Sequence, residues 1–377
     1  MITGADSVFM RRALRLARRG WGRVAPNPLV GAVVVRGGAV VGEGWHAEYG
    51  GPHAEVGALR AAGDAARGAT VYVTLEPCNH WGRTPPCVDA LLAARVARVV
   101  VAEADPHALA AGGAERLRAA GVTVDVGVLA AEATELNAAF FYDVTGATRP
   151  WITLKLALSL DGALADHARA PAWLTGEASR RAVHRMRAGH DAIAVGIGTA
   201  LADDPALTVR DVPAPRVSPL RVVFDRRARL PLGAALVRTT REVPTCVVCA
   251  PDAPADRLDA LAAAGVRVVV VGSIAEGCAA LRGQGVRSLF VEGGAAIVGA
   301  LWGADLVDRL VTFQAPVVLG AGALQAFGSA PAQSGRGARR LPVLRRRVLG
   351  GDLLTVYGVH PVPTRPAAPG SPVAPSP

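Results

Sequence analysis

Four side chains carry the clearest chemistry in the sequence, and they lie in His53-Ala54-Glu55, Pro77-Cys78 and Cys87. Catalytic zinc sites use three protein ligands and leave a fourth position for water, whose pKa the metal lowers from about 15.7 to about 7. We expect His53, Cys78 and Cys87 to bind Zn²⁺. Glu55 would then move protons between that water, a ring nitrogen and a departing amine. H-x-E followed by P-C-x-x-C is typical of zinc nucleobase deaminases, but here the two cysteines are nine positions apart.

The long loop between the two cysteines adds polar groups beside the expected metal, namely His80, Arg83 and Thr84. Arginine pairs with phosphate through two parallel hydrogen bonds. We therefore expect a substrate that carries a phosphate, with Arg83 as one of its contacts. The alternative for Arg83 is an ordinary surface arginine.

Alternating apolar and amphipathic segments must position these residues. Pro77-Cys78 follows a predicted strand, and His53 and Cys87 each stand at the start of a predicted helix. Strands that alternate with helices predict an α/β sandwich. The predicted helices are 7–19, 53–62, 87–94 and a fourth that ends at Gly121, and the predicted strands are 31–35, 40–44, 70–75, 98–102 and 122–126.

The strand–helix alternation is interrupted at 145–150, where Thr, Gly and Pro cluster. A second strand–helix alternation begins at Trp151 and ends near His360, after which Pro, Ala, Ser and Gly dominate. A length of 377 residues suits two domains. We predict one domain over 1–146, a second over 150–360, and a disordered tail over 361–377 that is too poor in apolar residues to fold.

The second alternation holds three suggestive features. Lys155 is the only lysine among 41 basic residues, which favours a role for a compact, mobile ammonium group, although chance survival is the alternative. Glu292-Gly293-Gly294 joins a predicted strand to a helix whose start could bind a cofactor pyrophosphate, or could be an ordinary tight turn. Cys246 and Cys249 lie three apart in a strand pattern, so we expect two buried cysteines on opposite faces and not a redox pair.

One further cofactor contact is expected at Arg226. It follows a predicted strand over 220–225, and ligands bind beyond the carboxyl ends of strands in open α/β sheets. An arginine there can hold the 2′-phosphate of NADP.

The composition limits what else the chain could do. A formal charge of +10 comes almost entirely from arginine, which indicates compositional bias, and the arginines within 336–347 suit a solvated surface better than an anionic partner. No apolar run reaches the ~18 residues that a membrane span needs. The first residues lack a secretory pattern, so we expect a cytoplasmic protein. Five cysteines are too few and uneven for a disulfide framework.

The first half resembles the deaminase half of the bifunctional riboflavin-biosynthesis deaminase–reductases. The matching motifs are Ala25–Gly31, Gly44–His46, His53–Glu55, Thr74–His80 and Gly82–Cys87. The long inter-cysteine loop separates this family from tRNA and cytidine deaminases. The resemblance implies a cytidine-deaminase-like three-layer sandwich that removes the 2-amino group of 2,5-diamino-6-(5-phosphoribosylamino)pyrimidin-4(3H)-one. It also implies that the base and the ribose phosphate are held by Asn27, His46, His80 and Arg83.

The second half resembles the reductase half of the same family, and the resemblance spans residues 5–358 in all. It implies a dihydrofolate-reductase-like α/β fold in which NADPH reduces the ribosyl group to a ribityl chain, with Lys155 and Asp203 flanking the hydride transfer. The implied NADPH contacts are Ala157, Trp173, Thr199, Asp203, Gly294, Ala295, Ala296, Ile297, Val298, Gly299 and Ala300. The implied substrate contacts are Pro171, Arg187, Leu207, Arg210 and Glu292. Pro171 stands where the family usually has serine, and Asn79 where it often has a small hydroxyl residue.

Two other hypotheses belong to different classes. The chain could bind or edit RNA, with the 336–347 arginines on phosphates, but the long inter-cysteine loop and the whole second domain argue against this. Alternatively, the second domain could be only a dimerising scaffold. We expect a homo-oligomer that acts on a small phosphorylated pyrimidine and binds neither nucleic acid nor membrane.

Overall fold

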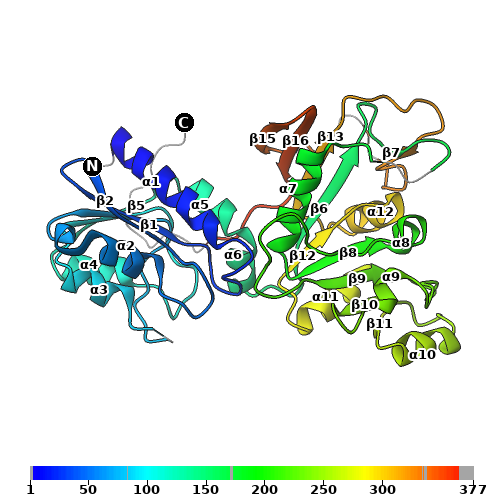
Figure 1. Cartoon of the computed structure of the whole chain (residues 1–377), viewed down its shortest axis with the longest axis horizontal. Coiled ribbons are helices and arrows are strands. Elements are labelled where there is room, and N and C mark those ends of the chain that lie inside the picture. The colour runs from blue at the N-terminus through cyan, green and yellow to red at the C-terminus, as the bar shows by residue number, and fades with distance from the viewer. Residues whose placement is uncertain (1–2, 83, 170–172, 333, 335–337, 365–377) are drawn as a thin grey trace. The chain divides into compact units, whose positions relative to one another are not determined.

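The chain folds into two compact units, each with its own sheet and core (Figure 1). The computed structural model describes residues 3–82, 84–169, 173–332, 334 and 338–364. The first unit runs to Ala147 and takes in Val362 near the other end of the chain; the second is Thr148–Pro361. The predicted tail lies outside the described residues from 365 onward.

The first unit is built on a five-stranded sheet of order β2-β1-β3-β4-β5. β1 pairs with β2 and β3 in antiparallel fashion, whereas β3, β4 and β5 are parallel. Its strands are β1 (Gly31–Arg36), β2 (Ala39–Trp45), β3 (Thr70–Val73), β4 (Arg98–Val101) and β5 (Thr123–Val126). Its helices are α1 (Gly4–Ala17), α2 (Ala54–Ala62), α3 (Cys87–Ala93), α4 (Gly113–Ala119), α5 (Ala130–Leu136) and α6 (Ala138–Val144), with short 3₁₀ turns at Arg18–Gly20 and Gly63–Ala66.

Helices cover both faces of this sheet, because alternate strand residues point to opposite sides. On β1, Ala32 and Val34 join the core under α2, α3 and α4, while Val33 and Val35 pack with α1 and α5. Figure 1 shows these two helical layers on either side of the sheet. The three-layer sandwich that the sequence predicts is confirmed.

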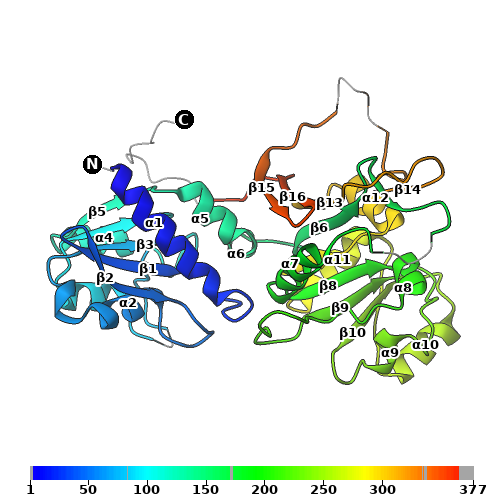
Figure 2. The ribbon, with the colours of Figure 1, turned by 45° about the horizontal axis from the view of Figure 1, so that its top comes forward.

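The second unit holds a nine-stranded sheet of order β11-β10-β9-β8-β12-β6-β13-β16-β15, and β7 (Ala163–Ala165) pairs with β14 (Leu324–Gln325) in a small separate sheet. All neighbours from β11 to β13 are parallel, and β16 and β15 are added antiparallel. Figure 2 shows β6, β8, β9 and β10 in this order across the sheet. The strands of the large sheet are β6 (Trp151–Leu158), β8 (Ala192–Gly196), β9 (Leu220–Phe224), β10 (Thr245–Cys249), β11 (Arg267–Val270), β12 (Ser288–Val291), β13 (Arg309–Gln314), β15 (Val343–Leu349) and β16 (Asp352–Gly358).

Helices again cover both faces of the large sheet. Apolar residues of α11 and α12 pack on one side, and those of α7, α9 and α10 on the other. Cys246 belongs to the first core and Cys249 to the second, so the predicted opposite facing of these two buried cysteines is confirmed. The helices are α7 (Glu177–Ala188), α8 (Ile197–Asp203), α9 (Ala235–Arg238), α10 (Ala255–Ala263), α11 (Ile274–Gly283) and α12 (Ala295–Gly303).

The start of the first helix differs from the sequence-based expectation. The first helix begins at Gly4 rather than at 7, because Thr3 is its N-cap and the Thr3 backbone N–H donates to the Asp6 carboxylate over 2.7 Å. Arg345–Arg347, which were expected on a solvated surface, lie on β15, the exposed edge strand of the large sheet. Arg336 lies outside the described residues. Among the residues that the structure describes, no helix is long and apolar enough to cross a bilayer.

Candidate active sites

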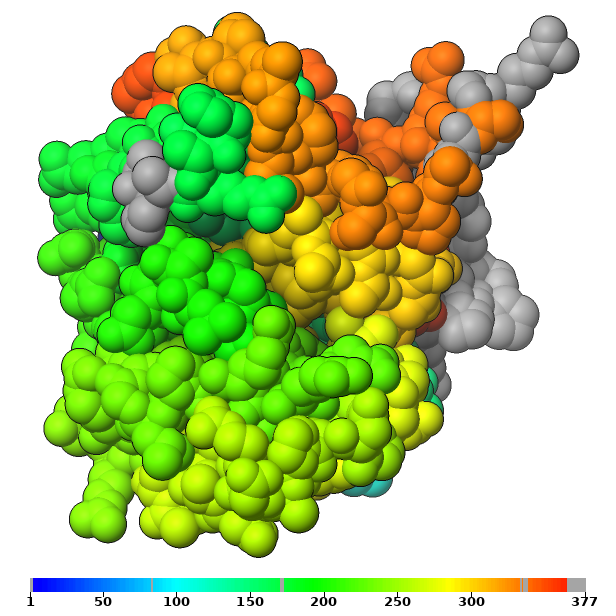
Figure 3. Space-filling model, turned by 90° about the vertical axis from the view of Figure 1, so that its right-hand side faces the viewer, coloured from blue at the N-terminus to red at the C-terminus, as the bar shows by residue number. Residues whose placement is uncertain are grey.

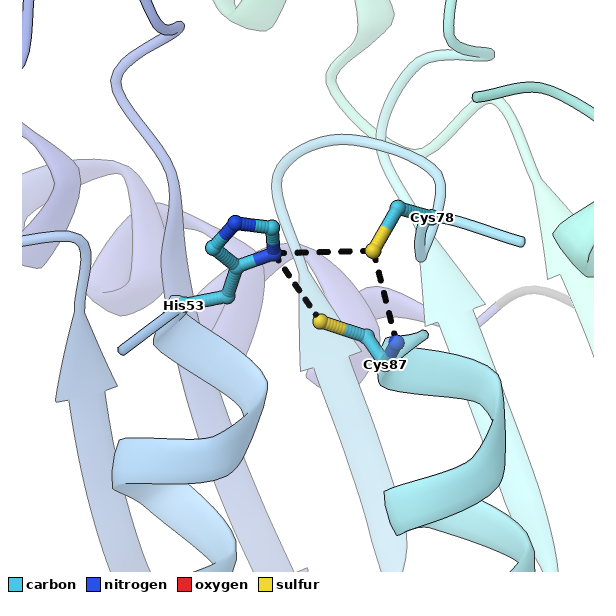
Figure 4. A group of neighbouring side chains, drawn as sticks. All are labelled: His53, Cys78 and Cys87. Carbon is cyan, nitrogen blue, oxygen red and sulfur yellow. Dashed lines mark hydrogen bonds between the residues drawn. The ribbon is translucent and has the colours of Figure 1, made fainter. Parts of the chain in front are cut away.

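The three expected zinc ligands converge in the first unit (Figure 4). His53 Nδ1 lies 3.2 Å from Cys87 Sγ and 3.5 Å from Cys78 Sγ. The Cys87 backbone N–H donates to Cys78 Sγ over 3.3 Å. All three ligand atoms lie within 4.8 Å of one another. No other group of three such side chains meets this condition in the described part of the chain.

These separations suit a tetrahedral zinc ion. Bonds of about 2.0 Å to nitrogen and 2.3 Å to sulfur place two ligand atoms about 3.5 Å apart at a tetrahedral angle. The observed nitrogen–sulfur distances of 3.2 and 3.5 Å lie slightly below that value and at it. Both thiols are buried, and the hydrogen bond from Cys87 lowers the pKa of Cys78 well below its ordinary value. The donor set therefore fits the metal that the sequence predicts.

Close backbone packing brings the histidine to this place. His53 is the N-cap of α2 and not part of its first turn, so its extended backbone directs the ring away from the helix. α2 lies directly on β2 because Gly42 and Gly44 have no side chains. A Cβ at either position would come within 2.3 Å of a carbonyl oxygen of α2, that of Ala58 or Ala54. Cys87 is the first residue of α3, and Cys78 lies in the turn beyond β3.

Glu55 lies in the first turn of α2 with 3% of its surface exposed. Burial raises the pKa of its carboxyl group from 4.5 to about 7, and the neighbouring Cys78 adds to the effect. A carboxyl group with that pKa can both accept and give up a proton near neutral pH.

Two predicted substrate contacts lie beside the zinc ligands. The rings of His46 and His53 meet edge to face with centroids 5.4 Å apart. His46 Nδ1 lies 3.2 Å from the Pro52 carbonyl oxygen, which can only accept, so Nδ1 carries the proton. His46 Nε2 then accepts from the Asn27 side-chain amide over 3.2 Å. His80 lies on the inter-cysteine loop with its side chain exposed, and Arg83 lies outside the described residues.

The second unit gathers a charged cluster at the end of β12, beside Lys155 in the interior of β6. Arg187 of α7 binds both carboxylate oxygens of Glu292, one of them over 2.9 Å. Burial lowers the pKa of Lys155, which interacts electrostatically with both residues. Burial alone would raise the pKa of Glu292, but the charge and hydrogen bond of Arg187 hold it below its ordinary value. Arg187 also donates to the Thr208 carbonyl oxygen over 2.8 Å, which ties the segment after α8 to the cluster.

Of the predicted cofactor residues outside α12, Thr199 lies against the turn into this helix. Gly293 and Gly294 have φ values of 66° and 92°, which residues with a side chain rarely adopt. A Cβ on Gly294 would come within 2.7 Å of Thr199 Oγ1. Thr199 and Asp203 belong to α8, and Ala157 to β6. Figure 3 shows the segment of α12, in yellow, reaching the surface between the green segment near residue 200 and the orange segment near residue 320. Glycine fits this turn, and a glycine backbone at the start of a helix can approach a bound ligand closely.

The other predicted residues of the second site differ in how exposed they are. Trp173 is 78% exposed, and the Arg180 guanidinium lies 5.3 Å from its ring centroid. Leu207 is buried, whereas the side chains of Arg210 and Asp203 are exposed. Pro171 lies outside the described residues. The residues of α12 that the resemblance implicates are Ala295, Ala296, Ile297, Val298, Gly299 and Ala300, and Ile297, Val298 and Gly299 are buried.

Comparisons with known proteins agree with this arrangement. Residues 150–354 match the RibD C-terminal domain, and residues 3–103 match the cytidine and deoxycytidylate deaminase zinc-binding region. The RibD of Aquifex aeolicus is 43% identical over 325 residues, which cover 85% of this chain and 90% of that protein. The chain belongs to the RibD family. It is accordingly a deaminase and a reductase of riboflavin biosynthesis, as its resemblance to that family predicts.

Solved structures extend the likeness to the whole RibD chain. Acinetobacter baumannii RibD is 36% identical and superposes with a TM-score of 0.78, covering 94% of this chain and 98% of that one. The diaminohydroxyphosphoribosylaminopyrimidine deaminase/5-amino-6-(5-phosphoribosylamino)uracil reductase of Thermotoga maritima is 33% identical, with a TM-score of 0.80 and the same coverage. The predicted fold class and the two predicted cofactors of RibD, zinc and NADPH, are confirmed at the level of the family.

Sequence reasoning missed two buried residues that hold the loops of these RibD sites. The Glu76 carboxylate accepts hydrogen bonds from the backbone N–H groups of Asp105, Gly112 and Ala114, at 3.1, 3.2 and 2.9 Å. His184 of α7 accepts one from the Arg210 backbone N–H at 3.2 Å. Both bind backbone groups far away in the sequence, and such pairs leave no spacing pattern to read.

Proposed function

We propose that the first unit deaminates 2,5-diamino-6-(5-phosphoribosylamino)pyrimidin-4(3H)-one and that the second reduces the product to 5-amino-6-(5-phosphoribitylamino)uracil. The observation that carries the first activity is the convergence of His53, Cys78 and Cys87 beside the buried Glu55. The second is supported by the Lys155, Arg187 and Glu292 cluster next to the glycine turn into α12.

In the deaminase, His53, Cys78 and Cys87 would hold the zinc ion. When bound, zinc supplies a water whose pKa is lowered to about 7. Glu55 is the proton carrier, taking a proton at its carboxylate and delivering it to the ring nitrogen and the departing amine. Its pKa of about 7 suits both directions of transfer.

The other contacts of the deaminase orient the substrate. His46 presents its ring beside His53, and the Pro52 carbonyl fixes its tautomer. Asn27 would then offer its side-chain amide to the base. His80 is exposed on the inter-cysteine loop, where it and Arg83 would meet the ribose phosphate.

In the reductase, NADPH supplies the hydride and the protein supplies binding and orientation. Gly294 to Ala300, with Ala157, Trp173, Thr199 and Asp203, would hold the cofactor, and Arg226, exposed beyond β9, would hold its 2′-phosphate. Lys155, whose pKa burial lowers, would donate a proton to the ribose oxygen as the hydride arrives at the adjacent carbon, with Asp203 beside it. Arg187, Leu207, Arg210 and Glu292, together with the backbone at Pro171, would contact the substrate.

Three wider statements belong to the same proposal. Residues 1–146 form the deaminase domain and 150–360 the reductase domain. The enzyme is cytoplasmic. It is a homo-oligomer, a state supported by the edge strand β15, on which Val343, Leu344 and Val348 are 44%, 42% and 74% exposed. Sedimentation at several concentrations tests the last statement, and a monomer at all of them would refute it.

The decisive experiment is to incubate the protein with the diamino substrate, with and without NADPH, and to weigh the products. Without NADPH we expect one product heavier by about 1 Da, since an amine is exchanged for oxygen. With NADPH we expect a further gain of about 2 Da, since a hydride and a proton are added. An unchanged substrate in a zinc-loaded preparation would refute the first activity. A deaminated product that NADPH leaves unchanged would refute the second.

A further inference from the structure

The segment after α8 is held to α7 by two side chains one turn apart. Arg187 donates to the Thr208 carbonyl oxygen over 2.8 Å, and the Arg210 backbone N–H donates to His184 Nδ1 over 3.2 Å. Arg187 is itself fixed by Glu292 at the end of β12. Leu207, at the start of the segment, is buried in the core with 3% of its surface exposed. Among the described residues, His184 is the one whose side chain accepts a hydrogen bond from the Arg210 backbone N–H.

The Arg210 side chain, in contrast, points into solvent. Its side chain is exposed, and Nη1 makes one long contact of 3.4 Å with Thr208 Oγ1. A long, exposed arginine side chain can swing through many rotamers, so the place of its guanidinium group depends on how firmly its backbone is anchored.

We propose that His184 is a positioning residue of the reductase, whose Nδ1 anchors the Arg210 backbone so that the guanidinium meets the anionic part of the substrate. This rests on the proposed function, in which Arg210 contacts a phosphorylated substrate. His184 is 8% exposed and acts through Arg210 rather than on the substrate.

The anchor requires a particular form of the imidazole ring. Because the Arg210 N–H donates, Nδ1 must be without a proton, and the neutral ring carries its proton on Nε2. The charged groups around the ring are Arg187 on the same helix, Arg210 and Asp211 on the facing segment, and Glu292 at the end of β12. Burial, and then the two arginines, lower the pKa of His184, while Glu292 and Asp211 act in the opposite direction. The neutral acceptor form is therefore favoured, and acid breaks the anchor.

Three substitutions test whether His184 acts as a hydrogen-bond acceptor at Nδ1 or only fills space. In His184→Asn the Oδ1 atom occupies nearly the place of Nδ1 and cannot be protonated. In His184→Gln the acceptor reaches the place of Nε2 instead. In His184→Leu the volume is kept and no acceptor is present. Deamination by the same preparations, which depends on the other unit, serves as the internal control.

We expect His184→Leu and His184→Gln to raise the KM for the deaminated intermediate about five-fold, the worth of one net hydrogen bond, with kcat and the KM for NADPH little changed. His184→Asn should keep the wild-type KM. The wild-type KM should also rise as the pH falls below neutral, and that rise should be absent in His184→Asn. Equal KM values for the Asn and Leu variants would overturn the proposal, as would a matching rise in the KM for NADPH.

Hydrogen–deuterium exchange tests the anchor without turnover. The Arg210 amide should exchange faster in His184→Leu than in the wild type and in His184→Asn, while amides in β6 are unchanged. An unchanged Arg210 amide in His184→Leu would overturn the proposal even in an active enzyme. A wild-type protein that never oxidises NADPH with the intermediate would refute the proposed reductase function instead.

Discussion

Glu55→Gln tests the first site most directly, because glutamine keeps the shape of the side chain but does not titrate. Zinc should remain bound as in the wild type, since Glu55 is not among the three converging ligand atoms. Deamination should fall by about 10²–10⁴-fold, the usual contribution of general acid–base catalysis. Metal analysis and the rate of ammonia release measure the two effects. A zinc-loaded variant with wild-type activity would refute the proton-carrying role.

The same substitution should also change the pH dependence of the stability of the fold. Glu55 is 3% exposed, and burial raises the pKa of its carboxyl group from 4.5 to about 7 in the metal-free protein. This shift corresponds to about 3 kcal/mol. Because the folded state binds the proton more tightly than the unfolded state, this residue lowers stability progressively as the pH rises from 4.5 to about 7. Above that window the full penalty remains.

Glutamine does not titrate, so the variant should gain stability over the wild type across the same window. We expect a gain on the order of 3 kcal/mol at the alkaline end and almost none of it below the ordinary pKa of glutamate. Urea unfolding of chelator-treated protein at several pH values measures it. The control is Glu132→Gln, an exposed glutamate on α5. A difference between Glu55→Gln and wild type that does not change with pH would refute the reasoning.

The remaining predictions concern metal, separability and cofactor choice. Cys78→Ser and Cys87→Ser should each lose zinc, as measured by metal analysis, since thiolates supply much of the affinity; zinc retained in both would mean that the ligands are wrong. His53→Ala should abolish deamination and spare reduction of the deaminated intermediate, and Lys155→Ala should do the reverse. One change that silences both reactions in a folded protein would refute two independent sites. Arg226→Ala should raise the KM for NADPH about tenfold and leave that for NADH nearly unchanged; equal effects would show that Arg226 only supports the end of β9.

Local motifs account for what could be predicted of the zinc site. Histidine and glutamate two positions apart at a helix start, and cysteine after proline at a strand end, are local patterns that place each side chain on its own element. The alternation of short apolar runs with helices predicted a sheet covered on both faces, and β1 shows why this works. Its successive valines enter opposite cores, so a continuous apolar run marks a strand buried on both sides.

Residues that act across the sheet could not be predicted in this way. His184 and Arg210 are 26 positions apart, and Glu76 and Ala114 are 38 apart. In both pairs the donor is a backbone N–H, which every residue other than proline carries. The partner of a histidine in a helix, or of a glutamate before a proline, therefore cannot be predicted until the order of the strands is known.

In both halves, a buried side chain accepts a hydrogen bond from the backbone of a segment beside the site. Loops beside both sites leave the carboxyl ends of parallel strands: those of Cys78 and Asp105 lie beyond β3 and β4, and that of Glu292 lies beyond β12. Such loops carry backbone N–H groups that no neighbouring strand can satisfy. In the first half the buried Glu76 carboxylate accepts from such groups at Asp105, Gly112 and Ala114. In the second half the buried His184 accepts from the Arg210 N–H in the segment after α8. Precision at each site therefore depends on a side chain that contacts no substrate, and substitutions there should change binding before they change the fold.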